Sequence, residues 1–313
     1  METSGDLASV VIPTYFRKSF LTSVISPLLE DPGTGEVIVV IDGSSDGSLD
    51  FLTRWSETES RIRPIFQENM GDNAARLRGA REARFDVIVF LDDDVQAGPH
   101  LIASHAQLHR GHPKRLALGY MPVRVPQRRE PGQVTTLLYA GDYENACALF
   151  DADPDKVFTN FWAGNFSLGR EVAVEILAVP SSRLGYHSDL QLGLRCREAG
   201  LEPVFDRSLV ATHNHHRSVQ AFAGEARRSG IGRAQLSREF PSFAVSLDPL
   251  VSLSPRAGLV ARYLGQRRMR RIAAPIVAQL CVLSGRLRIW RMETFAAQTL
   301  RIIELTAGFS SSH

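Results

Sequence analysis

The chain has 313 residues, of which 44% are hydrophobic and 22% charged, so it is long enough to bury a substantial core in one large domain or two modest ones. Its three cysteines lie far apart and form no C-x-x-C pair, which argues against a disulfide framework or a zinc knuckle and favours a reducing, cytoplasmic setting. The N-terminal residues lack the pattern of a secretion signal, and no run of about 18 apolar residues occurs, so we expect neither secretion nor a membrane span.

The net charge of +2 is unevenly distributed along the chain. Residues 255–313 contain ten arginines and two glutamates, a net charge of +8, which leaves 2 − 8 = −6 for residues 1–254. We expect two or three amphipathic helices beyond residue 240, the last over about 287–306. Packing of this basic tail on the rest of the protein is the favoured use. Peripheral contact with the inner face of a membrane and formation of a homodimer are the alternatives.

Strands and helices alternate along the first part of the chain. Apolar, β-branched runs predict strands at residues 8–12, 36–41, 62–66 and 86–91, and helical spacing predicts helices after the first of these strands and at 74–83. Such alternation predicts a parallel sheet with right-handed crossovers. An irregular stretch from 120 to about 160, with a surface loop at 123–133, should precede three further elements: a strand at 165–168, a helix at about 189–199 and a strand at 208–212.

Polar residues stand where the predicted strands end, and ligands of open α/β sheets bind at that edge. Asp92, Asp93 and Asp94 follow the strand at 86–91, and three adjacent carboxylates are tolerable when a divalent cation lies among them. Mg²⁺ and Mn²⁺ prefer such oxygens and bridge diphosphates well. The alternative is a solvated turn that caps the next helix.

Several other residues have a functional and a structural interpretation each. Asp42 could accept hydrogen bonds from a nucleobase, or belong to an ordinary Asp-Gly-Ser turn. Either Arg76 or Arg78 could clamp a phosphate, or each could lie on a solvated helix face. Asp189 could be a catalytic carboxylate, or cap its helix. The histidine cluster after the last strand could ligate Mn²⁺, or lie in a surface loop; it consists of His213, His215 and His216.

Six motifs in order resemble those of the family-2, inverting glycosyltransferases with a GT-A fold. The resemblance covers about residues 8–216, roughly two thirds of the chain, and is carried by VVIPTY (10–15), EVIVVIDGSSDGS (36–48), NMGDNAARLRGA (69–80), VIVFLDDDV (87–95), GNFSLGR (164–170) and SDLQLGLRCREAG (188–200). It implies an α/β fold with a Rossmann-like, mostly parallel sheet flanked by helices, followed by a C-terminal helical extension.

The resemblance also implies roles for individual residues. It places nine of them at the nucleotide-sugar site, the last two on its acceptor side: Pro13, Thr14, Tyr15, Asp42, Arg76, Asp92, Asp93, Gly164 and Asn165. Asp94 and His213 would ligate a divalent metal, Mn²⁺ or Mg²⁺, and Asp189 would be the general base. Two positions depart from the family pattern: Ile41 replaces the first aspartate of an Asp-Asp-Gly-Ser sequence, and Ser188 replaces the glutamate that usually precedes the catalytic aspartate.

We therefore expect a GT-A catalytic domain over residues 1–240, with a nucleotide-binding half at 1–120 and an acceptor-side half at 121–240, and a basic helical extension at 241–313. The expected reaction transfers a sugar from a nucleotide-diphosphate donor, with UDP favoured, to an acceptor with inversion. The acceptor class stays open among a glycan, a lipid carrier, a natural product and a peptide, and we expect no nucleic-acid partner.

Two other functions compete with sugar transfer. A nucleotidyltransferase would usually carry a glycine-rich basic loop after the first strand, where this chain has PTYFRKS, and the same position lacks the G-x-G-x-x-G of a dinucleotide dehydrogenase. A catalytically inactive scaffold that binds nucleotide sugars is the non-enzymatic alternative, and the presence of both Asp94 and Asp189 argues against it.

Overall fold

The structure is a computed structural model that describes residues 7–180, 184–251 and 253–311. The chain divides into two compact units, called here the sheet unit and the helical unit. The sheet unit consists of Met1–Arg124, Tyr143–Ser182 and Ser188–Asn214, and the helical unit of Val125–Asp142, Arg183–His187 and His215–His313. The expected limits of the catalytic domain and of the extension stay predictions.

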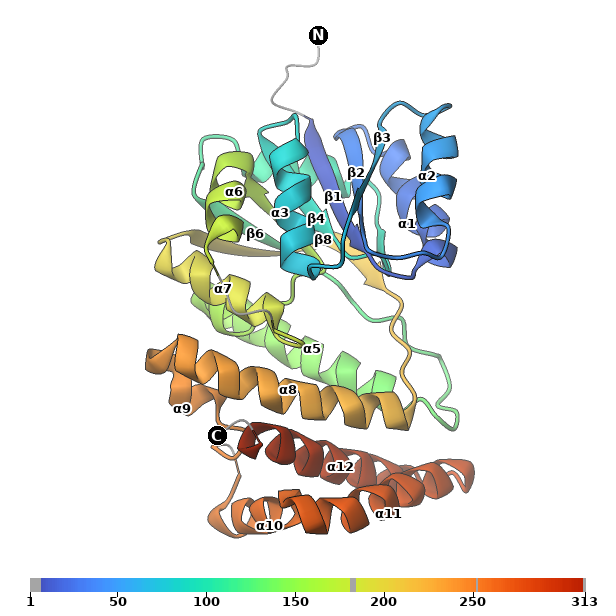
Figure 1. The fold of residues 1–313 in the computed structure, drawn as a ribbon, viewed down its shortest axis with the longest axis vertical. Helices are drawn as coiled ribbons and strands as arrows, with labels where there is room; N and C mark the ends of the chain where they lie inside the picture. Colours follow the sequence, from blue (N-terminus) through green and yellow to red (C-terminus); the bar gives the residue numbers. More distant parts are fainter. Residues whose placement is uncertain (1–6, 181–183, 252, 312–313) are drawn as a thin grey trace. The chain divides into compact units, whose positions relative to one another are not determined.

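The sheet unit is built on a mixed sheet. Within the described residues its eight strands run in the order β3-β2-β1-β4-β7-β6-β8-β5. Figure 1 shows the neighbouring strands β1, β2 and β3. Their bounds are β1 (Ala8–Thr14), β2 (Thr34–Asp42), β3 (Ile62–Gln67), β4 (Val87–Leu91), β5 (Val95–Ala97), β6 (Arg115–Tyr120), β7 (Asn165–Gly169) and β8 (Glu202–His213). Strands β3, β2, β1 and β4 are parallel, as are β6 and β8. Strand β7 is antiparallel to β4 and β6, and β5 is antiparallel to β8.

The parallel half of the sheet follows from its apolar runs. Residues 37–41 of β2 and 88–91 of β4 are fully buried, as expected of strands that helices cover on both faces. The helices of this unit are α1 (Lys18–Glu30), α2 (Ser48–Ser56), α3 (Asp72–Glu82), α4 (Leu101–Leu108), α6 (Arg170–Ala178) and α7 (Ser188–Glu198). The predicted β-α-β alternation of residues 8–91 is confirmed.

The prediction of an irregular stretch up to residue 160 is wrong. Helix α5 covers Val134–Ala152, and a 3-10 turn follows at Pro154–Thr159. From Tyr143 onward α5 belongs to the sheet unit and buries four side chains at helical spacing: Tyr143, Ala146, Cys147 and Phe150. Strand β8 is also longer than predicted, since it begins at Glu202 rather than at 208.

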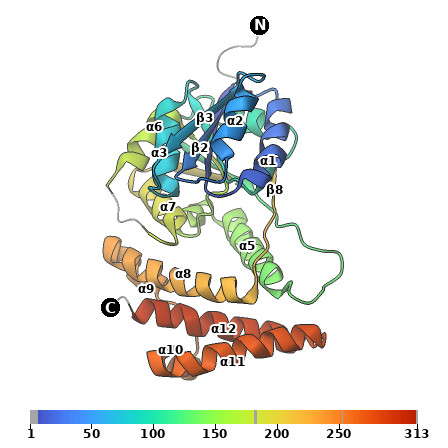
Figure 2. The ribbon, with the colours of Figure 1, turned by 45° about the vertical axis from the view of Figure 1, so that its right-hand side comes forward.

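The helical unit contains four long helices within its described residues. These are α8 (Val219–Glu239), α10 (Pro255–Gly265), α11 (Arg267–Arg286) and α12 (Trp290–Ser310), with a 3-10 turn at Pro241–Phe243 and the short α9 (Ala244–Leu247) between α8 and α10. Helix α12 lies between α8 and α11, as both views show (Figures 1 and 2). Helix α8 was not among the predicted elements, whereas the basic helices beyond residue 240 were.

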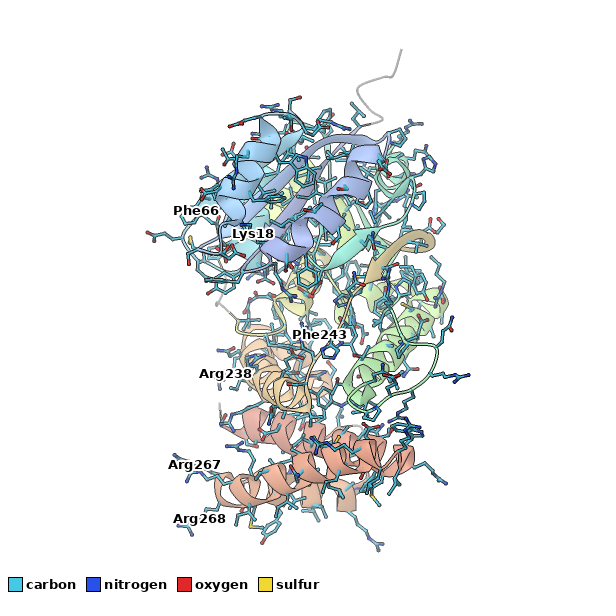
Figure 3. All side chains as sticks on the ribbon, turned by 90° about the vertical axis from the view of Figure 1, so that its right-hand side faces the viewer. Lys18, Phe66, Arg238, Phe243, Arg267 and Arg268 are labelled. Carbon is cyan, nitrogen blue, oxygen red and sulfur yellow. The ribbon has the colours of Figure 1, made fainter. Side chains whose placement is uncertain are left out.

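Small residues let two of these helices touch. A side chain at Gly230 of α8 would collide with the Leu305 carbonyl of α12, and one at Gly308 of α12 would collide with the Arg227 carbonyl of α8. At the other side of the bundle, Arg267 and Arg268 at the start of α11 project away from the ribbon (Figure 3). Within the described residues, no helix combines the length and the hydropathy needed to cross a bilayer.

Candidate functional site

Three adjacent parallel strands end at the same edge of the sheet. Because β2, β1 and β4 are neighbours in register, Asp42, Thr14 and the Asp92–Asp94 turn emerge along one edge. This arrangement confirms that the polar ends of the strands gather as the sequence pattern predicts.

Arg76 is the cation at the centre of this edge. It lies on α3 and is only 2% exposed. Its guanidinium lies 3.0 Å from Asp92, 3.4 Å from Asp72 and 3.6 Å from Asp189. Burial acts to lower the pKa of Arg76, but the three carboxylates outweigh it and raise the pKa further, so the side chain stays charged. One buried arginine thus holds together carboxylates from three separate segments of the chain.

Asp189 lies in the first turn of α7, yet its carboxylate turns away from its own helix. Oδ2 accepts a hydrogen bond of 3.3 Å from the Ala163 backbone N–H, and Oδ1 faces Arg76. Burial raises the pKa of Asp189 and Arg76 opposes that rise. Ser188 donates a 2.6 Å hydrogen bond to Asp72 and so fixes the start of α7 beside the start of α3. Ser188 therefore has a positioning contact at the site where it replaces the family's glutamate.

Asp93 anchors the segment that follows β1. The Thr14 hydroxyl donates a 2.8 Å hydrogen bond to its carboxylate, the Tyr15 backbone also bonds it, and Arg17 lies 4.0 Å away. Burial is the main reason that the pKa of Asp93 is raised to about 6. Pro13 lies within β1, and Tyr15, just after this strand, is 52% exposed. The middle carboxylate of the triplet therefore shapes the loop that should contact a nucleotide.

Asp94 faces two nitrogen-bearing side chains. Its Oδ1 lies 3.3 Å from His213 Nε2, and its Oδ2 lies 3.3 Å from the Arg17 guanidinium. The antiparallel pairing of Val95 in β5 with His213 in β8 brings the imidazole to this carboxylate. His213 is thus placed in the site rather than in a surface loop. The nearby His215 has a different contact: its ring stacks on that of Tyr139 within the helical unit, with the ring centroids 3.9 Å apart.

The donor set at Asp94 and His213 fits a divalent cation. A carboxylate oxygen and an imidazole nitrogen are both ligands that Mn²⁺ accepts, and they already face each other. Across the described residues, no three His, Cys, Asp or Glu side chains form a group that could hold an ion alone. Such an ion would therefore take most of its ligands from outside the chain, as Mg²⁺ commonly does with waters and phosphates.

Gly164 and Asn165 meet the site in different ways. A side chain at Gly164 would press on Asp92 and Met121, and the Gly164 carbonyl accepts a 3.2 Å hydrogen bond from the Asp92 N–H. Gly164 therefore lies directly against the Asp triplet. Asn165 is 1% exposed, donates to the Leu209 carbonyl at 3.0 Å and lies 3.0 Å from His105 Nε2. Its amide is engaged in the core beneath the edge.

Asp42 organises the loop before α3. Its carboxylate accepts hydrogen bonds of 2.8 Å from the backbone N–H groups of Met70 and Gly71 and from the Gln67 side chain. Gly71 has φ +92°, a value that favours glycine. Asp42 thus fixes the turn that immediately precedes α3, the helix that contains Arg76. This structural contact exists whether or not the same carboxylate also meets a base.

Comparison with known proteins identifies the family. The profile described as Glycosyl transferase family 2 matches residues 9–169, just over half of the chain. This chain belongs to glycosyl transferase family 2. Of the residues expected at the site from the sequence, the match covers all except Asp189 and His213, which lie beyond its end.

Relatives of this family-2 chain match it in part. The uncharacterized glycosyltransferase YfnE of Bacillus subtilis is 26% identical over 67% of this chain and 65% of its own length. Validoxylamine A glucosyltransferase of Streptomyces hygroscopicus subsp. limoneus is 40% identical over 52% of this chain and 38% of its own length. The chain thus spans less than two thirds of either relative.

Solved structures bear on the fold alone. The mannosyltransferase PcManGT of Pyrobaculum calidifontis, solved with GDP-Man and Mn²⁺, matches with a TM-score of 0.60 at 16% identity, over 97% of this chain and 87% of its own. Residues 1–349 of S. aureus TarS, solved with UDP-GlcNAc, match with a TM-score of 0.51 at 14% identity, over 94% and 91% of the two chains. The predicted GT-A fold with a C-terminal helical region is confirmed.

Arg17 is a site residue that sequence reasoning missed. It lies at the N-cap of α1 and reaches both Asp93 and Asp94. Nothing in the PTYFRKS segment distinguishes it from a solvated basic residue. Its role depends on β1 and β4 being neighbours, which the pattern of residues around Arg17 does not reveal.

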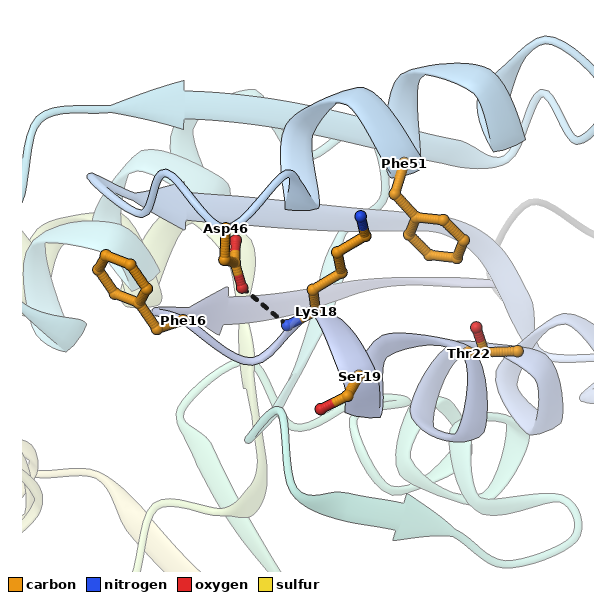
Figure 4. A pocket seen from close by; sticks show the side chains of 6 residues that line it. All are labelled: Phe16, Lys18, Ser19, Thr22, Asp46 and Phe51. Atoms are coloured by element: carbon orange, nitrogen blue, oxygen red, sulfur yellow. Dashed lines mark hydrogen bonds between the residues drawn. The ribbon is translucent and has the colours of Figure 1, made fainter.

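A pocket of about 490 Å³ opens beside the same loop, on the α1 and α2 side (Figure 4). Its lining residues are Phe16, Lys18, Ser19, Thr22, Asp46 and Phe51. The Lys18 backbone N–H donates a 3.0 Å hydrogen bond to Asp46, which ties the start of α1 to the turn after β2. The expected site residues do not line this pocket, so it is distinct from the carboxylate edge, the name used here for the sheet edge at which Asp72, Asp92, Asp93, Asp94 and Asp189 lie.

Proposed function

We propose that this protein transfers a sugar from a nucleotide-diphosphate donor to an acceptor, with inversion at the anomeric carbon and with a divalent metal ion. Asp189 is the proposed general base, and Asp94 with His213 would hold the metal. UDP is the favoured nucleotide of the donor, and a reducing cytoplasm is the proposed setting. The solved structures that share the fold were obtained with GDP-Man in one case and UDP-GlcNAc in the other, so both nucleotides need testing.

The observation that carries the proposal is the pairing of Asp189 with the Asp triplet through Arg76. The guanidinium contacts Asp92 and Asp189 at 3.0 and 3.6 Å, although 97 positions (189 − 92) separate the two aspartates in the chain. A carboxylate that takes a proton from the acceptor must lie near the carboxylates that receive the donor's diphosphate. The contact geometry supports both tasks at one site.

Asp189 is suited to taking a proton. Arg76 keeps a negative charge on it favourable, while burial raises its pKa toward that of a stronger base. The Ala163 N–H fixes one carboxylate oxygen, which limits the rotation of the group. A metal ion bound at Asp94 would supply positive charge against the diphosphate as it leaves. Attack on the face opposite the leaving group then inverts the anomeric configuration.

Calorimetric titration tests the donor site directly. We expect one of UDP, dTDP and GDP to bind in the presence of Mn²⁺ and to bind much more weakly without it. Asp94→Ala should lose the metal-dependent part of the affinity. Glu175→Gln, an exposed change on α6, is the matched control and should bind as the unchanged protein does. If no nucleotide binds under any condition, the proposed function is wrong.

The stereochemistry has its own readout. With an α-linked donor, a coupling constant measured by NMR on the product should identify a β-linkage. An α-linked product would contradict the single displacement but would not contradict the proposed nucleotide site.

A further inference from the structure

The outer side of α11 is apolar, although none of the described residues of the helical unit covers it. The helix buries Ala274, Cys281, Ser284 and Gly285 on the side that meets α12. Large apolar side chains recur every three or four residues on the opposite side: Ile272, Ile276, Leu280, Leu283 and, at the helix end, Leu287. Their exposed fractions range from 42% to 70%. From Ile272 to Leu287 the face is therefore a continuous apolar stripe about 22 Å long, at about 1.5 Å per residue.

Helix α10 extends this apolar surface. Leu259 and Tyr263, four residues apart, are 67% and 54% exposed. Helices α10 and α11 contact each other, and both pack on α12. We call the exposed apolar residues of α10 and α11, with the arginines beside them, the outer face. An exposed apolar surface of this extent is typical of an interaction site.

The charges of the outer face have one sign. Eight of the ten arginines in residues 255–313 are exposed: Arg256, Arg262, Arg267, Arg268, Arg271, Arg286, Arg288 and Arg291. The two acids of this segment are buried and engaged inside the unit. Glu293 pairs with Arg129 at 2.7 Å, and Glu304 pairs with Arg270 at 2.9 Å. No acidic side chain from α10 to α12 therefore neutralises the exposed arginines.

We propose that the outer face binds an anionic lipid bilayer. A helix that lies in the plane of the bilayer surface places its apolar side chains just below the headgroups and its arginines among the phosphates, which matches the pattern of α11. A second copy of the chain fits less well. A symmetric contact through this face would bring like-charged arginines together, and that repulsion destabilises the contact.

Co-sedimentation of the full chain with vesicles tests the proposal. The protein should pellet with vesicles of phosphatidylcholine mixed with phosphatidylglycerol and stay in solution with phosphatidylcholine alone. Raising the salt concentration should weaken the binding. The full chain is needed because α12 contributes to the core of the helical unit, so a truncation would disturb that core.

Two variants separate the apolar and the charged contributions. Arg268→Gln with Arg271→Gln should lower the partition coefficient about 25-fold, at about fivefold per arginine. Ile272→Gln, Ile276→Gln and Leu283→Gln together should lower it by more than about tenfold with no change in charge. Arg54→Gln with Arg81→Gln removes the same charge from exposed positions of the sheet unit and should leave binding unchanged.

Three outcomes would overturn the proposal. One is equal pelleting with and without anionic lipid. Another is the absence of pelleting together with a concentration-dependent dimer that the triple glutamine variant abolishes, because a second copy would then cover the face. The third is the absence of both pelleting and dimer. Circular dichroism checks that each variant is folded. If the triple glutamine variant does not fold, the double arginine variant alone tests whether the outer face binds the bilayer.

Discussion

The two units use charge in opposite ways. At the carboxylate edge of the sheet unit, five aspartates surround two arginines: Asp72, Asp92, Asp93, Asp94 and Asp189 around Arg17 and Arg76. In the segment from α10 to α12, two buried glutamates are each paired with an arginine. Arg301 pairs with Asp142, and eight of the ten arginines of residues 255–313 are exposed.

From this difference we infer that a cluster of charges with a surplus of one sign binds a partner of the opposite charge from outside the chain. A protein can bury an ion pair for structure alone, but a surplus of one sign is unfavourable until something of the other sign binds. The surplus of carboxylates fits a metal ion, and the surplus of arginines fits an anionic surface. Changes to surplus charges should therefore affect binding and turnover, whereas changes to matched charges should affect stability.

The largest expected effect is on turnover at Asp189. Asp189→Asn keeps the size of the side chain but removes the base, so nucleoside diphosphate release from the donor should fall about 10²- to 10⁴-fold. Calorimetry should show nucleotide affinity close to that of the unchanged protein, and Glu175→Gln is again the control. Loss of nucleotide binding together with turnover would mean that Asp189 holds the site together rather than acting as the base.

Arg76 is the matched charge of the same edge, so its removal should act on stability. Arg76→Met leaves three carboxylates without their cation and should lower the free energy of unfolding by about 3–5 kcal/mol. Arg78→Met, two residues along α3, removes an exposed partner of Glu82 and should change it by less than about 1 kcal/mol. Chemical denaturation compares the two. An equal loss of unfolding free energy in the two variants would show that the charge of Arg76 stabilises the fold no more than that of an exposed arginine.

Glu293 is the corresponding matched charge in the helical unit. It is 1% exposed and accepts a hydrogen bond from Arg129, so Glu293→Gln should lower the stability of α12 by about 2–3 kcal/mol. Hydrogen exchange followed on α12 peptides is the measurement, with the exposed Glu130→Gln as control. Nucleotide binding should not change. A loss of nucleotide affinity would break the distinction between matched and surplus charges.

The parallel strands and the Asp triplet could be predicted because their physics is local. A strand buried on both faces is a continuous apolar run, and the residues after it must lie at the sheet edge. Helix α5 is a different case. Its buried residues have helical spacing, but polar residues interrupt them, among them Asp142, Glu144 and Asn145, and the apolar pattern is weak. Contacts with residues elsewhere in the chain stabilise this helix, and the sequence of the helix alone does not reveal those contacts.

Partners distant in sequence account for the rest of what was missed. Arg17 meets Asp94 across 77 positions, and that contact depends on the order of strands. The acceptor-side role of Asn165 stays a prediction, but the contact of its buried amide with His105 could not be predicted, because it depends on the position of β7 between β4 and β6. A motif identifies which residues matter. Only the register of the sheet shows which way a side chain points.

The smallest expected effect concerns a neutral pair beneath the carboxylate edge, where neither unit's charge pattern applies. His105 and His109 of the α4 segment each lie 2.8 Å from the Ser167 hydroxyl, and burial lowers the pKa of both to about 4. In the unfolded chain a histidine has a pKa of about 6.5. Below that value the unfolded state binds more protons, so stability is complete above about pH 6.5 and is lost as the pH falls toward 4.

Between pH 7 and pH 5 the free energy of unfolding should therefore fall by about 2 kcal/mol for each of these histidines. Denaturation midpoints at the two pH values measure the loss. His105→Gln should flatten the pH dependence, because glutamine stays neutral, and the exposed His112→Gln should leave it unchanged. If the free energy of unfolding depends on pH equally in both variants, groups other than His105 cause the acid sensitivity. The crowded carboxylates are not among those groups, because their protonation at low pH relieves repulsion and stabilises the folded state.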